Sequence, residues 1–235
     1  MRILSVDSSA KSASAALTDN GRIIAECYSD AGLTHSKTLM PMIDGVFKNA
    51  DTDLSTVDVF AVTHGPGSFT GVRIGVAAIK GLADALGKKC IGISTLEAIA
   101  WSLQGFNCTA VCAMDARCNQ VYTASFAING NCIERLSEDE AISIDELLER
   151  LKNIEGDIYF VGDGAKLCFD KCTLKNAHLA PAHIVLQHAG CVGLCAEKKL
   201  EIQAPVDAGQ LTPVYLRVPQ AERELKKRQN TERKD

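Results

Sequence analysis

GPGSFTGVRIG, residues 65–75, is the stretch of this chain that says most about its fold. It follows an apolar run, Val57 to His64, that predicts a buried strand, and it leads into a periodic apolar segment, Val72 to Leu86, that predicts a helix. The glycines do not fit the Gly-x-Gly-x-x-Gly dinucleotide spacing, and the Gly-Lys-Ser/Thr of a P-loop is missing. We therefore expect a tight turn between a strand and a helix.

Two uses of this turn are open. Ser68 or Thr70 can cap the helix, whose first backbone amides could then hold an anion. Gly71 and Gly75 lie four residues apart on one helical face, which leaves a ridge without side chains where another backbone can approach. That backbone can belong to a partner, or it can belong to this chain in an ordinary packed turn.

The segments before and after this turn alternate strands and helices. The sequence Asn20-Gly21 predicts a hairpin turn between two of the strands. Ser36 can cap a helix with a continuous apolar stripe. The expected elements are strands Arg2 to Asp7, Ala13 to Thr18, Arg22 to Ser29 and Cys90 to Ile93, and helices Ser36 to Asn49 and Thr95 to Leu103.

The opening pattern then recurs. Thr109 to Asp115 is an apolar run that ends in aspartate, as Arg2 to Asp7 does, at an offset of 108 residues. Such an offset predicts two related lobes, each a mixed sheet with helices, around a cleft. The expected lobes are 1–103 and 104–218, followed by a charged tail, 219–235; whether the last helix crosses back to the first lobe is left open. The remaining expected elements are strands Gln120 to Ile128, Ile158 to Val161 and Ala177 to Leu179, and helices Ile144 to Leu151 and Gln187 to Lys199.

Composition narrows the possible partners and location. The chain is 46% apolar and 23% charged, which is typical of a globular protein. No run approaches the roughly 18 to 20 apolar residues of a membrane span, and the N-terminus does not resemble a signal peptide, so a cytoplasmic protein is expected. A net charge of −4 disfavours tight RNA binding by this chain alone. The segment 222–235 is locally basic, with six Lys or Arg against four acids.

We expect the ten cysteines to be small buried apolar groups rather than members of a disulfide framework or a metal site. None is spaced Cys-x-x-Cys. Three pairs at i, i+4, with histidines nearby in sequence, leave a metal site as the less favoured alternative: Cys108 and Cys112, Cys168 and Cys172, and Cys191 and Cys195.

The sequence resembles the TsaB family, also called YeaZ, over nearly the whole chain to about Arg217. The motifs that carry the resemblance are VDSS (6–9), THGPGSFTGVRIG (63–75), MDAR (114–117), GDG (162–164) and PVYLR (213–217). The resemblance implies two actin-like lobes of the ASKHA, or ribonuclease H-like, kind. It also implies a role as a scaffold or activator in threonylcarbamoylation of tRNA adenosine 37.

The family's partners follow from the same resemblance: a TsaD-like transferase and a TsaE-like ATPase, with a homodimer when the chain is alone and tRNA met only through the complex. No membrane partner is implied. In this family the helices of the first lobe make the contact. Carried onto this chain, the interface residues are Leu39, Met40, Ile43, Phe47, Gly71, Gly75 and Ile79.

The resemblance also implies a chain that is not an enzyme, with no catalytic residue, no metal ligand and no required cofactor. The catalytic relatives hold a metal with two histidines on a helix, and here Thr95 and Ile99 stand at the matching positions. The loop after Asp7 has no glycine to admit phosphates. Weak ATP or ADP binding remains open, and the candidate contacts are Asp7, Gly67, Ser68 and Gly162.

Two enzyme readings stand as alternatives. One is a nucleotide-dependent enzyme of the same superfamily, which would bind and turn over MgATP unaided. The other is a residual glycoprotease-like peptidase, for which Ser68 with His64 is the one local nucleophile and base pair.

Overall fold

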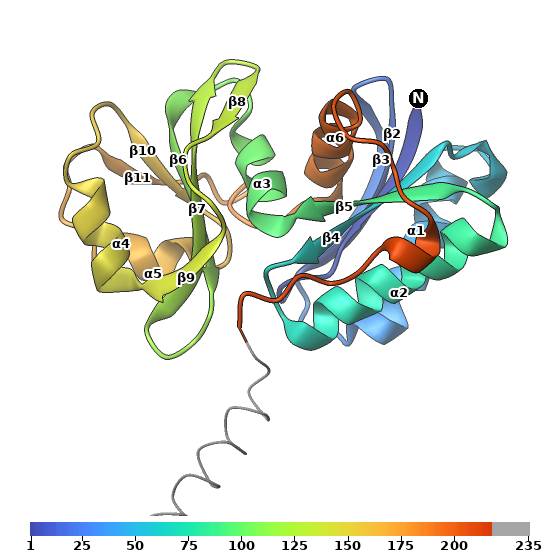
Figure 1. Ribbon diagram of the computed structural model, residues 1–235, viewed down its shortest axis with the longest axis horizontal. Helices are drawn as coiled ribbons and strands as arrows, with labels where there is room; N and C mark the ends of the chain where they lie inside the picture. The colour runs from blue at the N-terminus through green and yellow to red at the C-terminus, as the bar shows by residue number, and fades with distance from the viewer. Residues whose placement is uncertain (218–235) are drawn as a thin grey trace, which may run out of the picture.

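The computed structural model describes residues 1–217, which form two lobes side by side (Figure 1). The first lobe contains a five-stranded sheet in the order β3-β2-β1-β4-β5. Strand β1 pairs antiparallel with β2, which pairs antiparallel with β3, and β1, β4 and β5 are parallel. The strands are β1 (Arg2–Asp7), β2 (Ala13–Asp19), β3 (Arg22–Ser29), β4 (Val59–Gly65) and β5 (Lys89–Ser94).

The second lobe repeats this arrangement. Its sheet has the order β11-β10-β6-β7-β8, with antiparallel β6, β7 and β8 and parallel β6, β10 and β11. The predicted repeat is therefore confirmed strand by strand, and Asp7 and Asp115 end equivalent strands. The strands are β6 (Asn107–Asp115), β7 (Gln120–Asn129), β8 (Cys132–Arg135), β10 (Ile158–Val161) and β11 (Ala177–Leu179), and an additional β9 (Glu140–Ser143) pairs with β7.

Two helices cover one face of each sheet. In the first lobe, α1 (His35–Asn49) and α2 (Phe69–Ala85) bury their apolar stripes against β1, β2 and β4, in a core that includes Phe60 and Ile79. In the second lobe, α4 (Ile144–Leu151) and α5 (Ala165–Phe169) cover the equivalent face around Phe160. Ser68 and Ser143 cap α2 and α4, each accepting a backbone amide three residues later.

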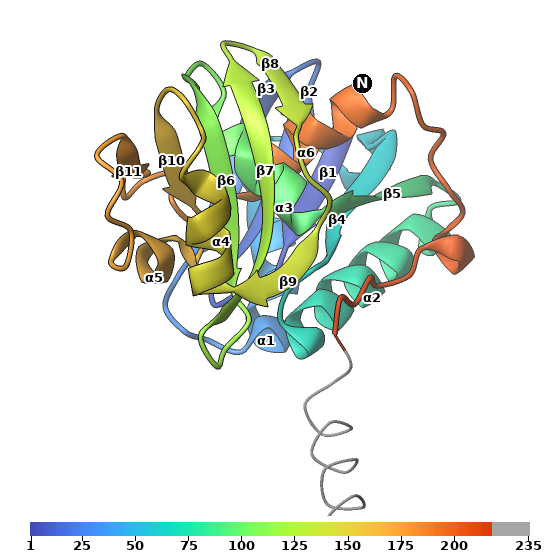
Figure 2. The same ribbon diagram turned by 60° about the vertical axis from the view of Figure 1, so that its left-hand side comes forward.

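The other face of each sheet is covered by a helix that comes from the opposite lobe. Helix α3 (Thr95–Ala100) follows β5, yet Leu96 and Ile99 pack in the core of the second lobe beside β6 and β7. Helix α6 (Ala189–Lys199) follows the second sheet, yet it packs on β1 and β2. Figures 1 and 2 show α3 between the two sheets.

This exchange of helices corrects the predicted lobe ranges, 1–103 and 104–218. The last helix does cross back, so residues 189–217 pack with the first lobe. Three polar contacts fix α6 there: Ser14 Oγ accepts from the Ala189 amide at 2.8 Å, Ser5 Oγ donates to the Ala189 carbonyl at 2.7 Å, and Glu26 accepts from the Gly190 amide at 3.0 Å. The predicted tail, 219–235, lies outside the described residues.

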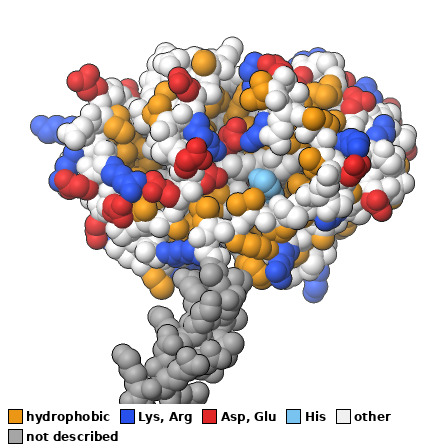
Figure 3. Space-filling model, in the orientation of Figure 1, with side chains coloured by type: hydrophobic (Ala, Val, Ile, Leu, Met, Phe, Trp, Pro, Cys, Tyr) orange, Lys and Arg blue, Asp and Glu red, His pale blue; other side chains and the backbone are white. Residues whose placement is uncertain are grey.

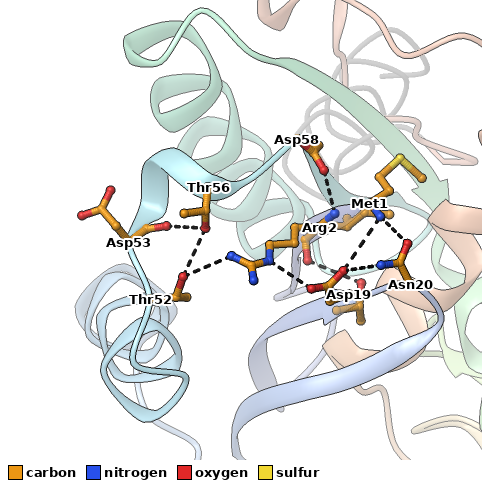
Figure 4. Close-up of polar contacts among 10 residues, drawn as sticks. Met1, Arg2, Asp19, Asn20, Thr52, Asp53, Thr56 and Asp58 are labelled. Carbon is orange, nitrogen blue, oxygen red and sulfur yellow. Dashed lines mark hydrogen bonds and ion pairs between the residues drawn. The ribbon is translucent and has the colours of Figure 1, made fainter.

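A polar cluster holds the start of β1 against its neighbours (Figure 4). The Met1 amine donates to Asn20 Oδ1 at 2.5 Å, and Arg2 Nε donates to Asp19 at 3.0 Å. The Arg2 amide also donates to Asp58 Oδ2 at 2.8 Å, just before β4. The first residues of the chain are thus tied to the β2–β3 hairpin and to the segment that enters β4.

After α6 the chain returns along α2 as residues 206–217, which we call the C-terminal strap; it contains one short 3₁₀ helix, Ala208–Gln210, and is otherwise irregular (Figure 1). Val206 forms an isolated bridge with Cys90 on the edge strand β5. Lys80 of α2 donates to the Leu211 carbonyl at 3.0 Å, and the Leu211 side chain is buried in the first-lobe core. The strap then reaches the boundary between the lobes, where the Val214 amide donates to the His64 carbonyl at 2.7 Å.

Candidate functional site

A cleft of about 850 Å³ lies between the two lobes. Its walls come from the loop after β1, the start of α2, the β6–β7 loop, Asp163 after β10, and the last residues of the strap. The residues that line it are Ser9, Ala10, Lys11, Ser12, Asp30, Pro66, Gly67, Ser68, Phe69, Thr70, Met114, Asp115, Ala116, Arg117, Tyr122, Asp163, Leu186, Val214, Tyr215, Leu216 and Arg217.

The first-lobe wall is built where β4 turns into α2. Gly67 lies so close to the loop after β1 that an added Cβ would stand 2.5 Å from the Ser9 carbonyl oxygen. The Ser68 amide donates to that same oxygen at 2.6 Å, and Ser68 Oγ accepts from the Gly71 amide at 3.2 Å. Gly67 and Ser68 therefore lie at the cleft, with the first turn of α2 beside them, and their contact with a nucleotide stays a prediction.

The other two predicted cofactor contacts do not line the cleft. Asp7 is buried and accepts hydrogen bonds from the amide and hydroxyl of Ser9, at 3.0 Å each. Burial raises the pKa of this carboxyl group. Gly162 is buried against β6, where an added Cβ would stand 2.2 Å from the Ala113 oxygen. Asp7 therefore organises its own loop, and Gly162 allows close packing.

Two carboxylates that the sequence analysis did not name as site residues stand on the second-lobe wall. Asp115 ends β6 and accepts from the Arg117 amide at 2.7 Å. Asp163 follows Gly162 and accepts from Gln187 Nε2 at 3.2 Å. Burial, and secondarily the neighbouring Asp115, raise the pKa of Asp163 to about 6. The motifs MDAR and GDG contain these two residues, so the sequence did mark them. It did not indicate that the two carboxylates lie near each other in the fold.

The strap closes one end of the cleft. The Tyr215 ring lies 4.7 Å from the Phe69 ring, and Arg73 stacks on Phe69 at 3.8 Å while its Nε donates to Tyr215 Oη at 2.9 Å. Arg217 donates to the Ala116 carbonyl of the second lobe at 3.1 Å. The motif PVYLR therefore serves as a structural connection between lobes.

The predicted interface residues of α1 and α2 lie mostly inside the first lobe. Their side chains pack against the sheet, with relative exposure of 8% or less for Leu39, Ile43, Phe47 and Ile79, whereas Met40 is 46% exposed. The glycine ridge also faces inward: an added Cβ at Gly71 would stand 2.0 Å from the Ser8 oxygen, and one at Gly75 would stand 2.6 Å from Ser8 Oγ. The backbone that approaches this ridge is therefore the chain's own, which corrects the placement of Gly71 and Gly75 at an interface.

The outward face of the two helices carries other residues. A groove of about 570 Å³ between α1, the following loop and α2 is lined by Met40, Ile43, Phe47, Leu54 and Leu82, with a rim of Asp44, Lys48, Asp51, Thr52 and Asp53. Beside it, the exposed side of α2 presents small residues at intervals of four, Ala77, Gly81 and Ala85, next to the exposed charged residues Arg73 and Asp84. The helical spacing of these residues could have been read from the sequence, but not which face of α2 is covered.

Helix α3, which contains Thr95 and Ile99, is mostly buried. Thr95 is fully buried, and Ile99 packs in the second-lobe core. Within residues 1–217, no group of three or more His, Cys, Asp or Glu side chains could hold a metal ion. His64 and Ser68 serve separate purposes, since Ser68 caps α2 and the His64 ring lies against Gly92, where an added Cβ would be 2.4 Å from Nδ1.

Several cysteines are small buried apolar groups, as expected from the sequence. Cys90, Cys112, Cys168 and Cys195 lie in the cores, and burial raises the pKa of each thiol, in Cys168 to about 12. Cys118 and Cys132 are exposed. Among the described residues, no helix is long and apolar enough to cross a membrane.

Two lobes with one strand order, exchanged helices and a cleft between them define an actin-like protein of the ASKHA kind. A protein from Pseudomonas aeruginosa, described as similar to peptidase YEAZ, has the same structure with a TM-score of 0.80 and 27% identity, over 92% of this chain and 99% of its own. The family model described as TsaD: tRNA N6-adenosine threonylcarbamoyltransferase matches residues 29–224.

Sequence comparison defines the family more narrowly. The tRNA threonylcarbamoyladenosine biosynthesis protein TsaB of Escherichia coli strain K12 is 31% identical over 92% of this chain and 95% of its own length. A tRNA N6-adenosine threonylcarbamoyltransferase of Erythrobacter litoralis is 40% identical, but over only 31% of this chain and 21% of its own. The chain belongs to the TsaB family, which confirms the predicted resemblance and the actin-like fold.

Proposed function

We propose that this chain is a non-catalytic accessory subunit in threonylcarbamoylation of tRNA adenosine 37, and that it docks a TsaD-like transferase through the outward face of α1 and α2. Membership of the TsaB family supports the pathway, because the relatives that match along the whole chain carry its name. In this proposal a TsaE-like ATPase also binds to the complex, tRNA is bound by the assembled complex, and the modification takes place in the cytoplasm.

The docking surface is inferred from an apolar groove that lies beside a helix face with small side chains. Met40 is exposed at the groove although methionine is usually buried, and it adapts readily to a partner surface. Beside it, an added Cβ at Gly81 would meet nothing within 4 Å, so a partner helix can approach α2 closely there. The docking residues are therefore Met40, Ala77, Gly81 and Ala85, together with the partly accessible groove wall, rather than Gly71 and Gly75.

The buried matching helix supports a role without catalysis. Thr95 and Ile99 offer a hydroxyl and a hydrocarbon inside the protein, so they suit packing and not metal binding. The nucleotide-dependent alternative has less support, since Asp7 is buried against Ser9 and lies outside the cleft lining. The peptidase alternative has less support because Ser68 Oγ is engaged as a helix cap.

The docking surface is tested by isothermal titration calorimetry with the TsaD-like transferase from the same organism. Met40→Glu and Ala77→Arg place charge on the face, and each is expected to weaken binding at least tenfold, about 1.4 kcal/mol. Leu167→Glu is the matched control, because Leu167 is 44% exposed on α5 of the second lobe. The same two variants are expected to shift the isolated chain from dimer to monomer in analytical ultracentrifugation.

Reconstitution tests the accessory role. The transferase and ATPase should modify tRNA faster when the wild-type chain is added, and Met40→Glu should abolish that gain while Leu167→Glu retains it. Unchanged transferase binding by both surface variants would remove the docking proposal. Modification of tRNA by this chain alone would remove the non-catalytic one.

A further inference from the structure

A group of charged side chains joins the lobes beside α3. Glu97 of α3 lies 3.0 Å from Lys199 of α6 and 3.6 Å from Arg135 of β8. Arg135 in turn lies 2.7 Å from Asp139, whose other oxygen accepts from Ser94 Oγ at 2.5 Å. We call Ser94, Glu97, Arg135, Asp139 and Lys199 the charge clamp. It joins the end of β5 and helix α6, on the first sheet, to the β8–β9 segment of the second.

The charge clamp is less exposed than most other ion pairs of the described chain, and the His188–Glu26 pair, at 23% and 22%, is similarly buried. The side chains of its four charged members are each 19% to 27% exposed, whereas the Lys48–Asp44 pair, for example, is 74% and 61% exposed. Arg135 is also stacked 4.7 Å over the Phe126 ring. Partly buried, mutually bonded charges lose less of their attraction to solvent than exposed pairs do. In Figure 3, charged side chains of both signs meet at the upper part of the lobe boundary.

A second inter-lobe contact lies at the cleft. Arg217, at the end of the strap, donates to the Ala116 carbonyl at 3.1 Å and lies 5.9 Å from the Tyr122 ring centre. The strap itself is held to the first lobe at His64, Phe69 and Arg73. We call Arg217, with Ala116 and Tyr122, the strap clamp.

The two clamps grip the second sheet at well-separated points. Arg135 is paired with Phe126, which is paired with Ala110 on β6, whereas Arg217 binds the residue after Asp115. Five residues along a strand span roughly 17 Å. A lobe held at one point can rotate about it in any direction, whereas a lobe held at two points this far apart keeps only rotation about the line that joins them.

We propose that the charge clamp and the strap clamp together lock the two lobes at a fixed angle, so that this chain acts as a rigid body and its cleft does not open and close. The exchange of α3 and α6 favours the same outcome, because each lobe already contains a helix of the other. The inference does not depend on the proposed partner: it concerns the isolated chain.

The test measures the distance between the lobes by double electron–electron resonance. Spin labels are attached through azide-bearing residues at Lys37 and Glu155, both exposed, so the ten cysteines remain untouched. Labelled protein is diluted with unlabelled chain to suppress signals between molecules. The wild-type chain should give one narrow distance peak, unchanged by addition of MgATP.

Methionine substitutions remove the arginine from each clamp while keeping its aliphatic stem; Arg135→Met breaks the ion pairs with Glu97 and Asp139 and leaves the Ser94–Asp139 and Glu97–Lys199 contacts. Arg135→Met with Arg217→Met should at least double the width of the distance distribution, and each single variant should give an intermediate width. Arg150→Met is the matched control, because within residues 1–217 Arg150 pairs only with Glu140 and Glu146 of its own lobe. Circular dichroism and a cooperative thermal transition confirm that the variants are folded.

A wild-type distance distribution as broad as that of the double variant would overturn the proposal that the lobes are locked at a fixed angle. A double variant as narrow as the wild type would overturn the role given to Arg135 and Arg217, since the two arginines would then contribute nothing to the angle. An opening or closing shift of the wild-type peak on addition of MgATP would overturn the claim that the cleft is fixed.

Discussion

The backbone oxygen of Ser8 lies directly against Gly71, where an added Cβ would be 2.0 Å away. This contact joins the loop after β1 to the first turn of α2, and Ser8 Oγ reinforces it by donating to the Gly71 carbonyl at 2.8 Å. The start of α2 is therefore positioned by the loop of a strand more than sixty residues earlier. The glycine exists to let the two backbones meet.

Gly71→Ala should destabilise the chain by about 1–3 kcal/mol, because the methyl group must displace a backbone carbonyl rather than a flexible side chain. Gly81→Ala on the same helix is the control. Its Cβ has open space, and alanine favours helix over glycine, so this variant should gain up to about 1 kcal/mol. Urea unfolding at one protein concentration checks both; equal effects of the two variants would contradict the packing.

Asp163 should make the chain less stable as pH rises from about 4 to about 6. Its pKa in the folded chain is about 6, above the ordinary value of 3.8, so the folded state holds more protons than the unfolded state in this window. The free energy of unfolding therefore falls with rising pH, by up to about 3 kcal/mol from this group. Urea unfolding at a series of pH values measures the slope.

Asp163→Asn removes this titration, so the difference in stability between variant and wild type should grow in favour of the variant between pH 4 and pH 6.5. Asp170→Asn serves as the control, because Asp170 is exposed and paired only with Lys166. A difference that stays constant with pH would show that Asp163 does not titrate in this range.

Thiol reactivity should separate the cysteines by exposure. Cys118 and Cys132 are expected to react within minutes with a disulfide reagent in the folded chain. Cys168 and Cys191, whose pKa values burial raises to about 12, should react only after unfolding. Mass spectrometry after timed quenching identifies the labelled sites.

Elemental analysis of the same preparation should show no stoichiometric zinc or iron.

Binding of tRNA by the isolated chain should be weak, because a net charge of −4 supplies little attraction for a phosphate backbone. Fluorescence anisotropy with labelled tRNA at about 150 mM salt measures it. A submicromolar Kd under these conditions would show that local basic charge outweighs the overall balance.

The sequence predicts most of the fold because its signals are local. Asn20-Gly21 marks a hairpin, and the terminal aspartates of β1 and β6 mark the repeat. The short elements β9 and α5 were not predicted, because four or five residues are too few to show a period. The expected helix from Val72 begins earlier, at Phe69, because Ser68 is its cap.

Long-range contacts account for what the sequence did not predict. Helical spacing places Gly71 and Gly75 on one face, but it does not say that Ser8 fills that face. Likewise, Asp7 and Asp115 end equivalent strands, yet one is buried and the other is exposed at the cleft. The two lobes have the same strand order, and their surroundings differ because the strap and the exchanged helices meet them differently.

The exchange of helices has a consequence for synthesis. The face of β1 and β2 that carries Ser5 and Ser14 stays uncovered while the ribosome makes the whole second lobe, because α6 follows that lobe in the chain. The first lobe therefore precedes the second in synthesis but is completed after it. A chain truncated before residue 189 contains both sheets but lacks α6. The second lobe then has all of its covering helices, whereas one face of the first sheet is left bare.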